Sequence, residues 1–237
     1  MRKVGLIFLA LLINHLSFSQ QVIQDGNVET RDVKGFHGIK VATGIQLYLT
    51  QGTTEAVAVS AANIEDRDRI KTEVRNGVLK IYYDYNFWRL LKSHNRKLKA
   101  YVSIVDIDML DLSSGAYVKV DGALKSNQLN FDASSGAVFK GQVDVGDLDV
   151  DQSSGSVVTM TGVVGKLRVD GSSGSVFHGY ELQVENCFAD VSSGAGAQVT
   201  IKKELSAEAS SGGYVSYKGE GVIRNLRTSS GGSVRKK

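Results

Sequence analysis

The chain of 237 residues has one cysteine, no proline and only four histidines. A single cysteine, Cys187, excludes an internal disulfide, and its place in an apolar column predicts a buried, inert thiol. The absence of proline suits β-ladders, whose hydrogen bonds proline would interrupt. The histidines that follow the N-terminal segment, His37, His94 and His178, lack the H-x-x-x-H spacing of a metal site. No disulfide framework or histidine-based metal centre is therefore expected.

Long apolar runs are also missing, except at the N-terminus. Two basic residues precede an apolar run over residues 5–13, and the small Ser17 and Ser19 follow it. This pattern predicts a secretory signal peptide over residues 1–19 and a mature chain that begins at Gln20, with an uncleaved membrane anchor as the alternative. No second run reaches the roughly 18 apolar residues of a membrane span, so we expect no transmembrane segment after cleavage. The protein would then be exported to the periplasm, the cell surface or the medium.

The charge of the chain is small overall but unevenly placed. The formal net charge is +3, yet residues 106–160 carry 3 basic and 9 acidic groups. An exported protein without a continuous basic stretch does not suit nucleic acid, so we expect no nucleic-acid partner.

The tripeptide Ser-Ser-Gly recurs seven times and organises the second half of the chain. The first serines are Ser113, Ser134, Ser153, Ser172, Ser192, Ser210 and Ser229. Successive copies therefore follow one another at a nearly constant spacing. A fixed period of roughly 20 residues is typical of a solenoid.

Aligned on the first serine, the repeats show alternating columns. The residues three positions earlier are apolar: Leu110, Phe131, Val150, Val169, Ala189, Ala207 and Leu226. The residues two positions earlier are acidic except in the last copy: Asp111, Asp132, Asp151, Asp170, Asp190, Glu208 and then Arg227. A second apolar cluster follows each motif, five positions after the first serine. Alternation with period 2 predicts strands with one face inward, joined by a turn in which glycine takes a positive φ and the acidic side chain accepts from turn amides.

These columns predict an all-β fold, a right-handed parallel β-helix of about 19-residue coils. An antiparallel sandwich is the alternative, but hairpins do not demand identical residues at identical offsets. Residues 31–105 lack the repeat, and Asn76-Gly77 there predicts a hairpin with a type I′ turn. We therefore divide the chain into the signal peptide, an irregular N-terminal capping region with the first coils at 20–105, and the repeat solenoid at 106–237.

Two segments and the repeat together resemble a known family. The segments are Val33-Lys34-Gly35-Phe36-His37-Gly38-Ile39-Lys40-Val41-Ala42-Thr43-Gly44-Ile45-Gln46-Leu47-Tyr48-Leu49-Thr50-Gln51-Gly52 and Asn76-Gly77-Val78-Leu79-Lys80-Ile81. With the run of Ser-Ser-Gly turns, they look like the head GIN domain, labelled a "putative autotransporter adhesin" and found in exported bacterial proteins. The resemblance covers about residues 31–235. It implies a β-helical, extracytoplasmic domain and supplies no catalytic residues.

The acidic column is the first candidate site. Asp132, Asp151 and Asp170 should stack on adjacent coils, with Asp149 on the same face. Ca²⁺ accepts six to eight oxygen ligands in irregular geometry, which makes it the candidate cofactor for this patch. The alternatives are a row of turn-capping side chains that face water, and a sugar-binding patch.

An aromatic and basic stretch is the second candidate site, for a ligand such as a glycan. Its members could stack on sugar rings or rest on an anionic surface. They are Tyr82, Tyr85, Phe87, Trp88, Arg89, Lys92 and Arg96. The alternative is that the aromatic side chains plug the end of the solenoid and the charges face water.

The function that these features indicate is a non-catalytic extracytoplasmic binding or scaffold module, adhesin-like, with a cell-surface glycan or an envelope protein as partner. The alternative is a polysaccharide-active β-helix enzyme, a lyase or hydrolase, that uses Asp149, Asp151 and Asp170 beside Arg168. A deep groove in which these residues converge would favour the enzyme, and a smooth rod would favour the binding module.

Overall fold

The computed structural model describes residues 26–85 and 96–237. The predicted signal peptide lies outside the described residues, as do Phe87, Trp88, Arg89 and Lys92 of the aromatic and basic stretch. Within the described part of the chain, no helix is long and apolar enough to span a membrane.

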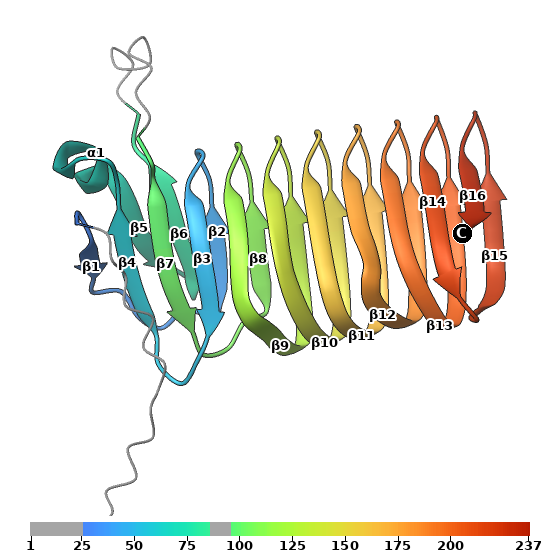
Figure 1. Ribbon diagram of the computed structural model, residues 1–237, viewed down its shortest axis with the longest axis horizontal. Coiled ribbons are helices and arrows are strands. Elements are labelled where there is room, and N and C mark those ends of the chain that lie inside the picture. Colours follow the sequence, from blue (N-terminus) through green and yellow to red (C-terminus); the bar gives the residue numbers. More distant parts are fainter. Residues whose placement is uncertain (1–25, 86–95) are drawn as a thin grey trace, which may run out of the picture.

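The molecule is a right-handed parallel β-solenoid, as the repeat predicts (Figure 1). In each coil the chain rises along one face to a turn at the top edge and descends along the opposite face. The first face includes β2 (Gly38–Val41), β8 (Met109–Leu112) and β15 (Val222–Thr228). The second includes β3 (Gln46–Gln51), β14 (Tyr214–Gly219) and β16 (Ser233–Lys236). Five long strands bend from the second face into the first: β9 (Tyr117–Ala133), β10 (Val138–Gln152), β11 (Val157–Gly171), β12 (Val176–Val191) and β13 (Gly196–Ala209).

The register of the strands follows the repeat. Val150 pairs with Phe131 on one side and with Val169 on the other, and every pairing from β9 to β16 is parallel. The prediction that the Ser-Ser-Gly motifs lie along one edge is therefore confirmed, and the antiparallel sandwich is excluded.

Each Ser-Ser-Gly turn has two residues in the left-handed region, where glycine alone was expected. The second serine has φ between 48° and 53°, and the glycine between 69° and 79°. In the first turn the Ala116 N–H donates to the Ser113 carbonyl at 3.0 Å, which closes a type I′ turn. The Gly115 N–H donates to the Ser135 carbonyl of the next turn, also at 3.0 Å. The ladder of the strands thus continues through the turns.

The turn amides do not depend on the acidic side chains. The amides of Ser153, Gly155 and Ser156 donate to the backbone carbonyls of Ala133, Ser173 and Ser153. The expectation that the acidic column caps these amides is wrong, because neighbouring coils accept from Ser153 and Gly155 and the turn itself accepts from Ser156.

An eighth turn precedes the seven found by motif. Thr43 and Gly44 have φ values of 61° and 69°, and the Gly44 N–H donates to the Ser114 carbonyl at 3.0 Å. Ala42 and Thr43 stand in place of the two serines, so a search for Ser-Ser-Gly does not find this turn.

The N-terminal end carries one more layer and a cap. The strands β6 (Val78–Tyr83) and β7 (Lys99–Ile104) pair in parallel with β2 and β3 on the side away from the repeat. Antiparallel strands then cover this layer, and a short helix lies beside them. They are β1 (Glu29–Arg31), β4 (Ala56–Ser60), β5 (Ile70–Arg75) and α1 (Ile64–Asp68). The predicted Asn76-Gly77 hairpin joins β5 to β6, with φ values of 52° and 74°.

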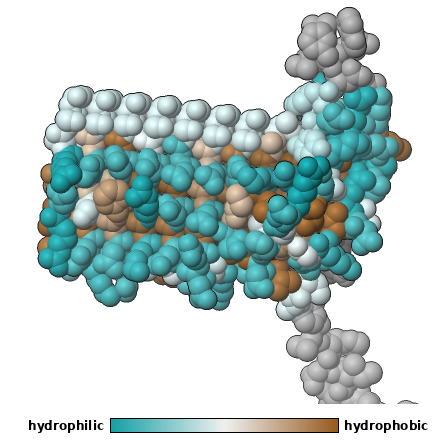
Figure 2. Space-filling view, turned by 180° about the vertical axis from the view of Figure 1, so that it is seen from behind, coloured by the Kyte–Doolittle hydropathy of each residue, from teal (hydrophilic) through white to brown (hydrophobic). Residues whose placement is uncertain are grey.

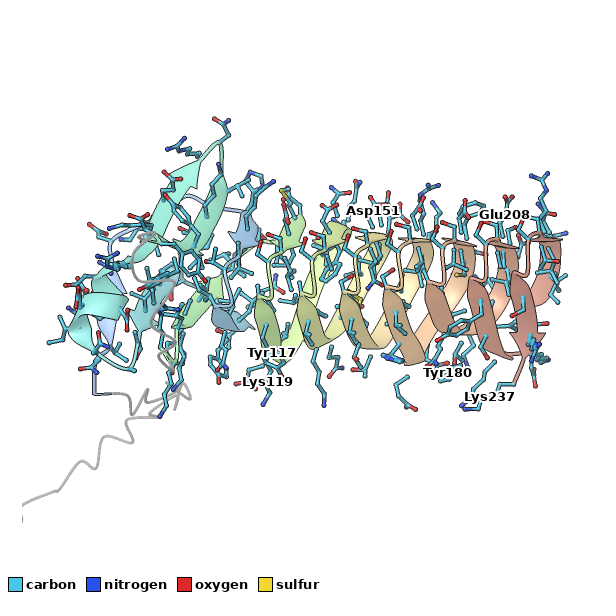
Figure 3. The ribbon with its side chains drawn as sticks, turned by 90° about the horizontal axis from the view of Figure 1, so that it is seen from above. Tyr117, Lys119, Asp151, Tyr180, Glu208 and Lys237 are labelled. Atoms are coloured by element: carbon cyan, nitrogen blue, oxygen red, sulfur yellow. The ribbon has the colours of Figure 1, made fainter. Side chains whose placement is uncertain are left out.

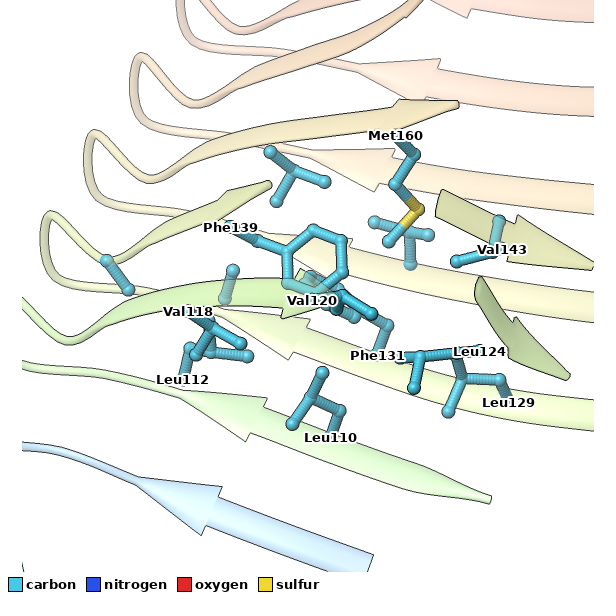
Figure 4. Close-up of a cluster of buried hydrophobic side chains, with 14 of the residues drawn as sticks. Leu110, Leu112, Val118, Val120, Leu124, Leu129, Phe131, Phe139, Val143 and Met160 are labelled. Atoms are coloured by element: carbon cyan, nitrogen blue, oxygen red, sulfur yellow. The ribbon is translucent and has the colours of Figure 1, made fainter. Parts of the chain in front are cut away.

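The core is a continuous apolar column between the two faces (Figure 4). Phe131 and Phe139 meet edge to face, with ring centroids 4.9 Å apart. Cys187 is buried in this column, and burial raises the pKa of its thiol to about 12, which agrees with an inert thiol. Gln152 is also buried beneath the turns and donates to the Val176 carbonyl.

The alternation of inward and outward side chains yields a first prediction. Val150 is fully buried, whereas the side chain of Asp149 is about half exposed. Val150→Asp should lower the free energy of unfolding by more than about 3 kcal/mol, because it buries an unpaired charge. Asp149→Asn should stay within about 0.5 kcal/mol. Chemical denaturation of both variants checks this, and equal midpoints would contradict the assignment of the two faces.

A second prediction isolates the backbone strain of the turns. A Cβ at Gly155 would meet no atom within 4 Å, so only its φ of +69° opposes a side chain. Gly155→Ala should therefore destabilise by about 1 kcal/mol. Ser154→Ala is the matched control, because Ser154 already holds a side chain at φ 52° and should change the melting temperature little. Equal losses in the two variants would show that the strain does not reside at the glycine.

Candidate functional site on two opposite faces

We call the first face, which contains β2, β8 and β15, the acidic face. Its main outward column consists of Asp111, Asp132, Asp151, Asp170, Asp190 and Glu208, all in register. Lys40 precedes this column and pairs with Asp111 at 3.0 Å, and Arg227 follows it and pairs with Glu208 at 3.2 Å. Figure 3 shows Asp151 and Glu208 on this side of the solenoid. A basic side chain thus stands at each end of the row of acidic side chains.

Stacking shifts the titration of this column. Partial burial, followed by the charges of Asp111 and Asp151, raises the pKa of Asp132. Burial, followed by Asp149 and Asp170, raises the pKa of Asp151. Both shifts mean that the folded protein holds protons on these groups more tightly than the unfolded chain does.

The four predicted calcium ligands lie on this face, but they do not converge. Asp132, Asp151 and Asp170 are register partners, whereas Asp149 faces Arg168 at 3.6 Å. The same guanidinium donates to Asp170 at 3.1 Å and lies 5.3 Å from the ring centre of Phe188. Within residues 26–85 and 96–237, no three Asp, Glu, His or Cys side chains are grouped to hold a metal ion. Calcium binding at these residues stays a prediction.

Hydrophilic side chains cover most of the acidic face (Figure 2). Two open depressions lie on it. One, of about 440 Å³, is lined by Asp149, Arg168 and Phe188 among others. The other, of about 530 Å³, is lined by Asp151 and Asp170. The residues proposed for an enzyme are therefore divided between two depressions, and neither is a deep groove.

We call the second face, which contains β3, β14 and β16, the basic-aromatic face. Two outward columns run along it, at four and six positions after each first serine. The first is Lys99, Gln46, Tyr117, Val138, Val157, Val176, Gly196, Tyr214 and Ser233. The second is Tyr101, Tyr48, Lys119, Lys140, Thr159, His178, Gln198, Ser216 and Arg235. Neither of these two columns contains an acidic residue, although the exposed Asp121 follows Lys119 by two positions on β9. These columns therefore differ from the acidic column in the sign of their charge.

Aromatic rings on this face are held in place by their neighbours. Tyr48 and Tyr101 stack, with ring centroids 5.2 Å apart. Near the other end, Tyr180 donates to the Ser216 hydroxyl at 2.7 Å. Lys218 and Lys237 place their Nζ atoms 4.4 and 4.8 Å from its ring centre. Figure 3 shows Tyr117, Lys119, Tyr180 and Lys237 together on the side opposite Asp151.

The basic-aromatic face was not predicted from the sequence. The alignment on the first serine contains the signal, since Lys119, Lys140 and Arg235 share one offset. It was overlooked because the column is chemically mixed, whereas the acidic column is nearly uniform.

The described part of the aromatic and basic stretch lies at the N-terminal end, where Tyr82 belongs to β6. Tyr82 and Tyr85 are exposed, but Arg96 lies over the rings of Tyr83 and Tyr85, at 5.5 and 5.8 Å. The Tyr83 hydroxyl donates to the buried Asp66 at 2.6 Å, and the Arg96 Nε lies 3.9 Å from the same carboxylate. Arg96 thus joins the cap to the solenoid. A ligand-binding role for this stretch stays a prediction.

Comparison with models of known families shows to which family the chain belongs. The family described as "Putative auto-transporter adhesin, head GIN domain" matches residues 35–221. The protein belongs to the head GIN domain family. This membership confirms the resemblance seen in the sequence and agrees with a binding module.

Solved structures share the fold of this head GIN domain. A putative adhesin from Bacteroides fragilis superposes with a TM-score of 0.79 at 16% identity, covering 90% of this chain and 98% of its own. One from Parabacteroides merdae gives 0.67 at 16%, covering 90% and 97%. A putative lipid binding protein from Parabacteroides distasonis gives 0.63 at 17%, covering 90% and 97%. No curated protein matches the chain.

The raised pKa values of the acidic column yield a third prediction. Because the pKa of Asp151 is higher in the folded state, this group destabilises the fold at neutral pH, and the loss disappears as pH falls through the raised pKa. Asp151→Asn should therefore raise the melting temperature at pH 7. Its advantage over the parent should shrink as the pH is lowered to about 4.

Calorimetric melts of both proteins across this range check the sign. A variant that melts below the parent at neutral pH would show that Asp151 forms a favourable interaction, and would contradict the repulsive column.

Proposed function

We propose that this head GIN domain is a non-catalytic binding module of an exported, adhesin-like protein, and that its basic-aromatic face binds an acidic cell-surface polysaccharide. The observation that carries the proposal is the absence of acidic residues from the two columns that lie four and six positions after the first serine. Lys99, Lys119, Lys140 and Arg235 are spaced along these columns. The family and the structural neighbours described as adhesins support the binding role.

The geometry of the face suits an extended polymer. Parallel strands place equivalent side chains of successive coils about 4.8 Å apart, so Lys119 and Lys140 offer neighbouring positive charges on a rigid support. Tyrosine rings such as Tyr117 and Tyr214 can stack on sugar rings, and both are half-buried and so ordered before binding. A polymer with a carboxylate on each sugar meets both features, because its charges repeat along its length.

The fourth prediction tests this face with polygalacturonate as the acidic probe and dextran as the neutral one. The protein should bind polygalacturonate at low salt, weaken as salt is added, and ignore dextran, because exposed charge pairs are screened. Lys119→Gln with Lys140→Gln should lower the affinity about tenfold, which corresponds to about 1.4 kcal/mol.

The control carries the same loss of charge elsewhere. Lys166 and Lys203 pair with Asp147 and Glu185, away from the basic-aromatic face. Lys166→Gln with Lys203→Gln should retain full affinity. Equal losses in the two double variants would attribute binding to net charge alone and overturn the assignment of the face.

Two further measurements separate this proposal from its alternatives. A structural neighbour described as a lipid binding protein makes phosphatidylglycerol vesicles the second anionic probe. Stronger binding to vesicles than to polygalacturonate would replace the polysaccharide with a membrane surface. A polysaccharide-active enzyme on the acidic face is the catalytic alternative, and shortening of polygalacturonate chains during incubation would reveal it.

A further inference from the structure

The two ends of the solenoid differ in what covers their outermost strands. At the N-terminal end, the antiparallel strands β4 and β5 cover the outermost layer, and α1 lies beside them (Figure 1). At the C-terminal end, β15 and β16 form the last layer. No strand among the described residues pairs with their outer edges. Such an edge presents unpaired N–H and C=O groups to any extended segment.

The outer edge of β15 is apolar. Ile223 and Leu226 are in register with Leu205 and Ala207, which are 1% and 0% exposed. Ile223 and Leu226 themselves are 41% and 43% exposed, because no other coil among the described residues covers them. Val222 is also exposed, at 59%, but it is in register with the outward Glu204 and so points to the other side of the strand.

The outer edge of β16 carries a charged residue that opposes the addition of another strand. Lys236 is in register with Tyr217, an inward position that is 7% exposed in the preceding coil. A charge at an inward position of an edge strand opposes the stacking of another strand. The last layer can therefore accept a strand along β15 but not a complete further coil.

Charge defines what kind of strand fits. β15 carries Arg224 and Arg227 and no acidic residue, and both guanidiniums pair with Glu204 and Glu208 of the preceding coil. The side chains of Arg224 and Arg227 nevertheless stay 62% and 70% exposed, so each can contact a second carboxylate. Opposite charges on adjacent strands stabilise a sheet and like charges destabilise it, so the complementary strand is acidic.

A second copy of the chain fits this edge poorly. A twofold axis that joins the two C-terminal ends sets β15 antiparallel either to β15 or to β16 of the other copy. The first arrangement brings Arg224 and Arg227 of both copies onto one surface. The second places Lys236 in the interior and Arg235 beside the arginines of β15.

We propose that the outer edge of β15 binds an extended acidic segment of a partner protein by strand addition. Apolar side chains of that segment would cover Ile223 and Leu226, and alternating carboxylates would meet Arg224 and Arg227. In this mode the main chain supplies affinity and the alternating side chains supply specificity. The interaction uses the end of the solenoid and is independent of the basic-aromatic face.

The probe for the fifth prediction is a labelled synthetic peptide with the sequence Glu-Leu-Ser-Ala-Glu-Ala-Ser-Ser. It copies residues 204–211, most of which form the strand that pairs with the inner edge of β15. The control peptide has lysine in place of both glutamates. Fluorescence anisotropy with the full chain should show the acidic peptide binding at least about tenfold more tightly, a difference that salt reduces.

Variants of the protein locate the contact. Leu226→Asp, at an already exposed position, should abolish binding of the acidic peptide without lowering the melting temperature. Arg227→Gln should weaken it several-fold, whereas Arg235→Gln on β16 should not. Hydrogen exchange should show new protection in β15 when the peptide is added.

Four outcomes would overturn the proposal. Equal binding of both peptides would remove the role of charge, and full affinity of Leu226→Asp would remove the apolar contact. A concentration-dependent dimer that Leu226→Asp dissociates, seen by sedimentation, would assign the edge to a second copy. If the peptide does not bind and β15 gains no protection from hydrogen exchange, the role of the arginines would be to prevent aggregation at this edge.

Discussion

The hydrogen bonds that join one Ser-Ser-Gly turn to the next hold the register on which the remaining structure depends. Each turn closes on itself through one bond, as from the Ala116 N–H to the Ser113 carbonyl, and donates another to its neighbour, as from Gly115 to Ser135. A slip by one residue would move the apolar column outward and the acidic column inward. Because the turn repeats the same φ values in every coil, such a slip is opposed at each turn.

The opposition of the two faces follows from this register. A column forms only when the same offset returns to the same place in each coil. The acidic column ends in cations at both ends, and the opposite face is free of acids in its two columns. The fold thus converts a one-dimensional pattern into two surfaces of different charge, which can take partners of different chemistry.

Much of the architecture could be predicted because the same sequence pattern recurs in seven copies. Seven copies reveal the columns, and the period of two in a strand then fixes whether each column points inward or outward. Two kinds of feature were missed: those that occur once, and those whose residue type does not reveal the conformation or the surface. The Ala42-Thr43-Gly44 turn was missed because two of its three residues differ from the motif. The left-handed serine recurs in all seven motifs and was missed because its side chain gives no sign of its φ. Arg96 was placed in a ligand site, whereas its neighbours Asp66, Tyr83 and Tyr85 come together only through the packing of α1 against the cap.

The coil made of β2 and β3 comes first in the chain but lies inside the stack. Its partners are distant in sequence, since Gly38 pairs with Val78 on one side and with Met109 on the other. Within the repeats, by contrast, each position pairs with its equivalent in the very next coil, as Asp132 does with Asp151. Closing the loop from Gly38 to Met109 costs about 1 kcal/mol more entropy than closing one coil. Folding is therefore expected to nucleate among the Ser-Ser-Gly coils, and the coil made of β2 and β3 to join them later.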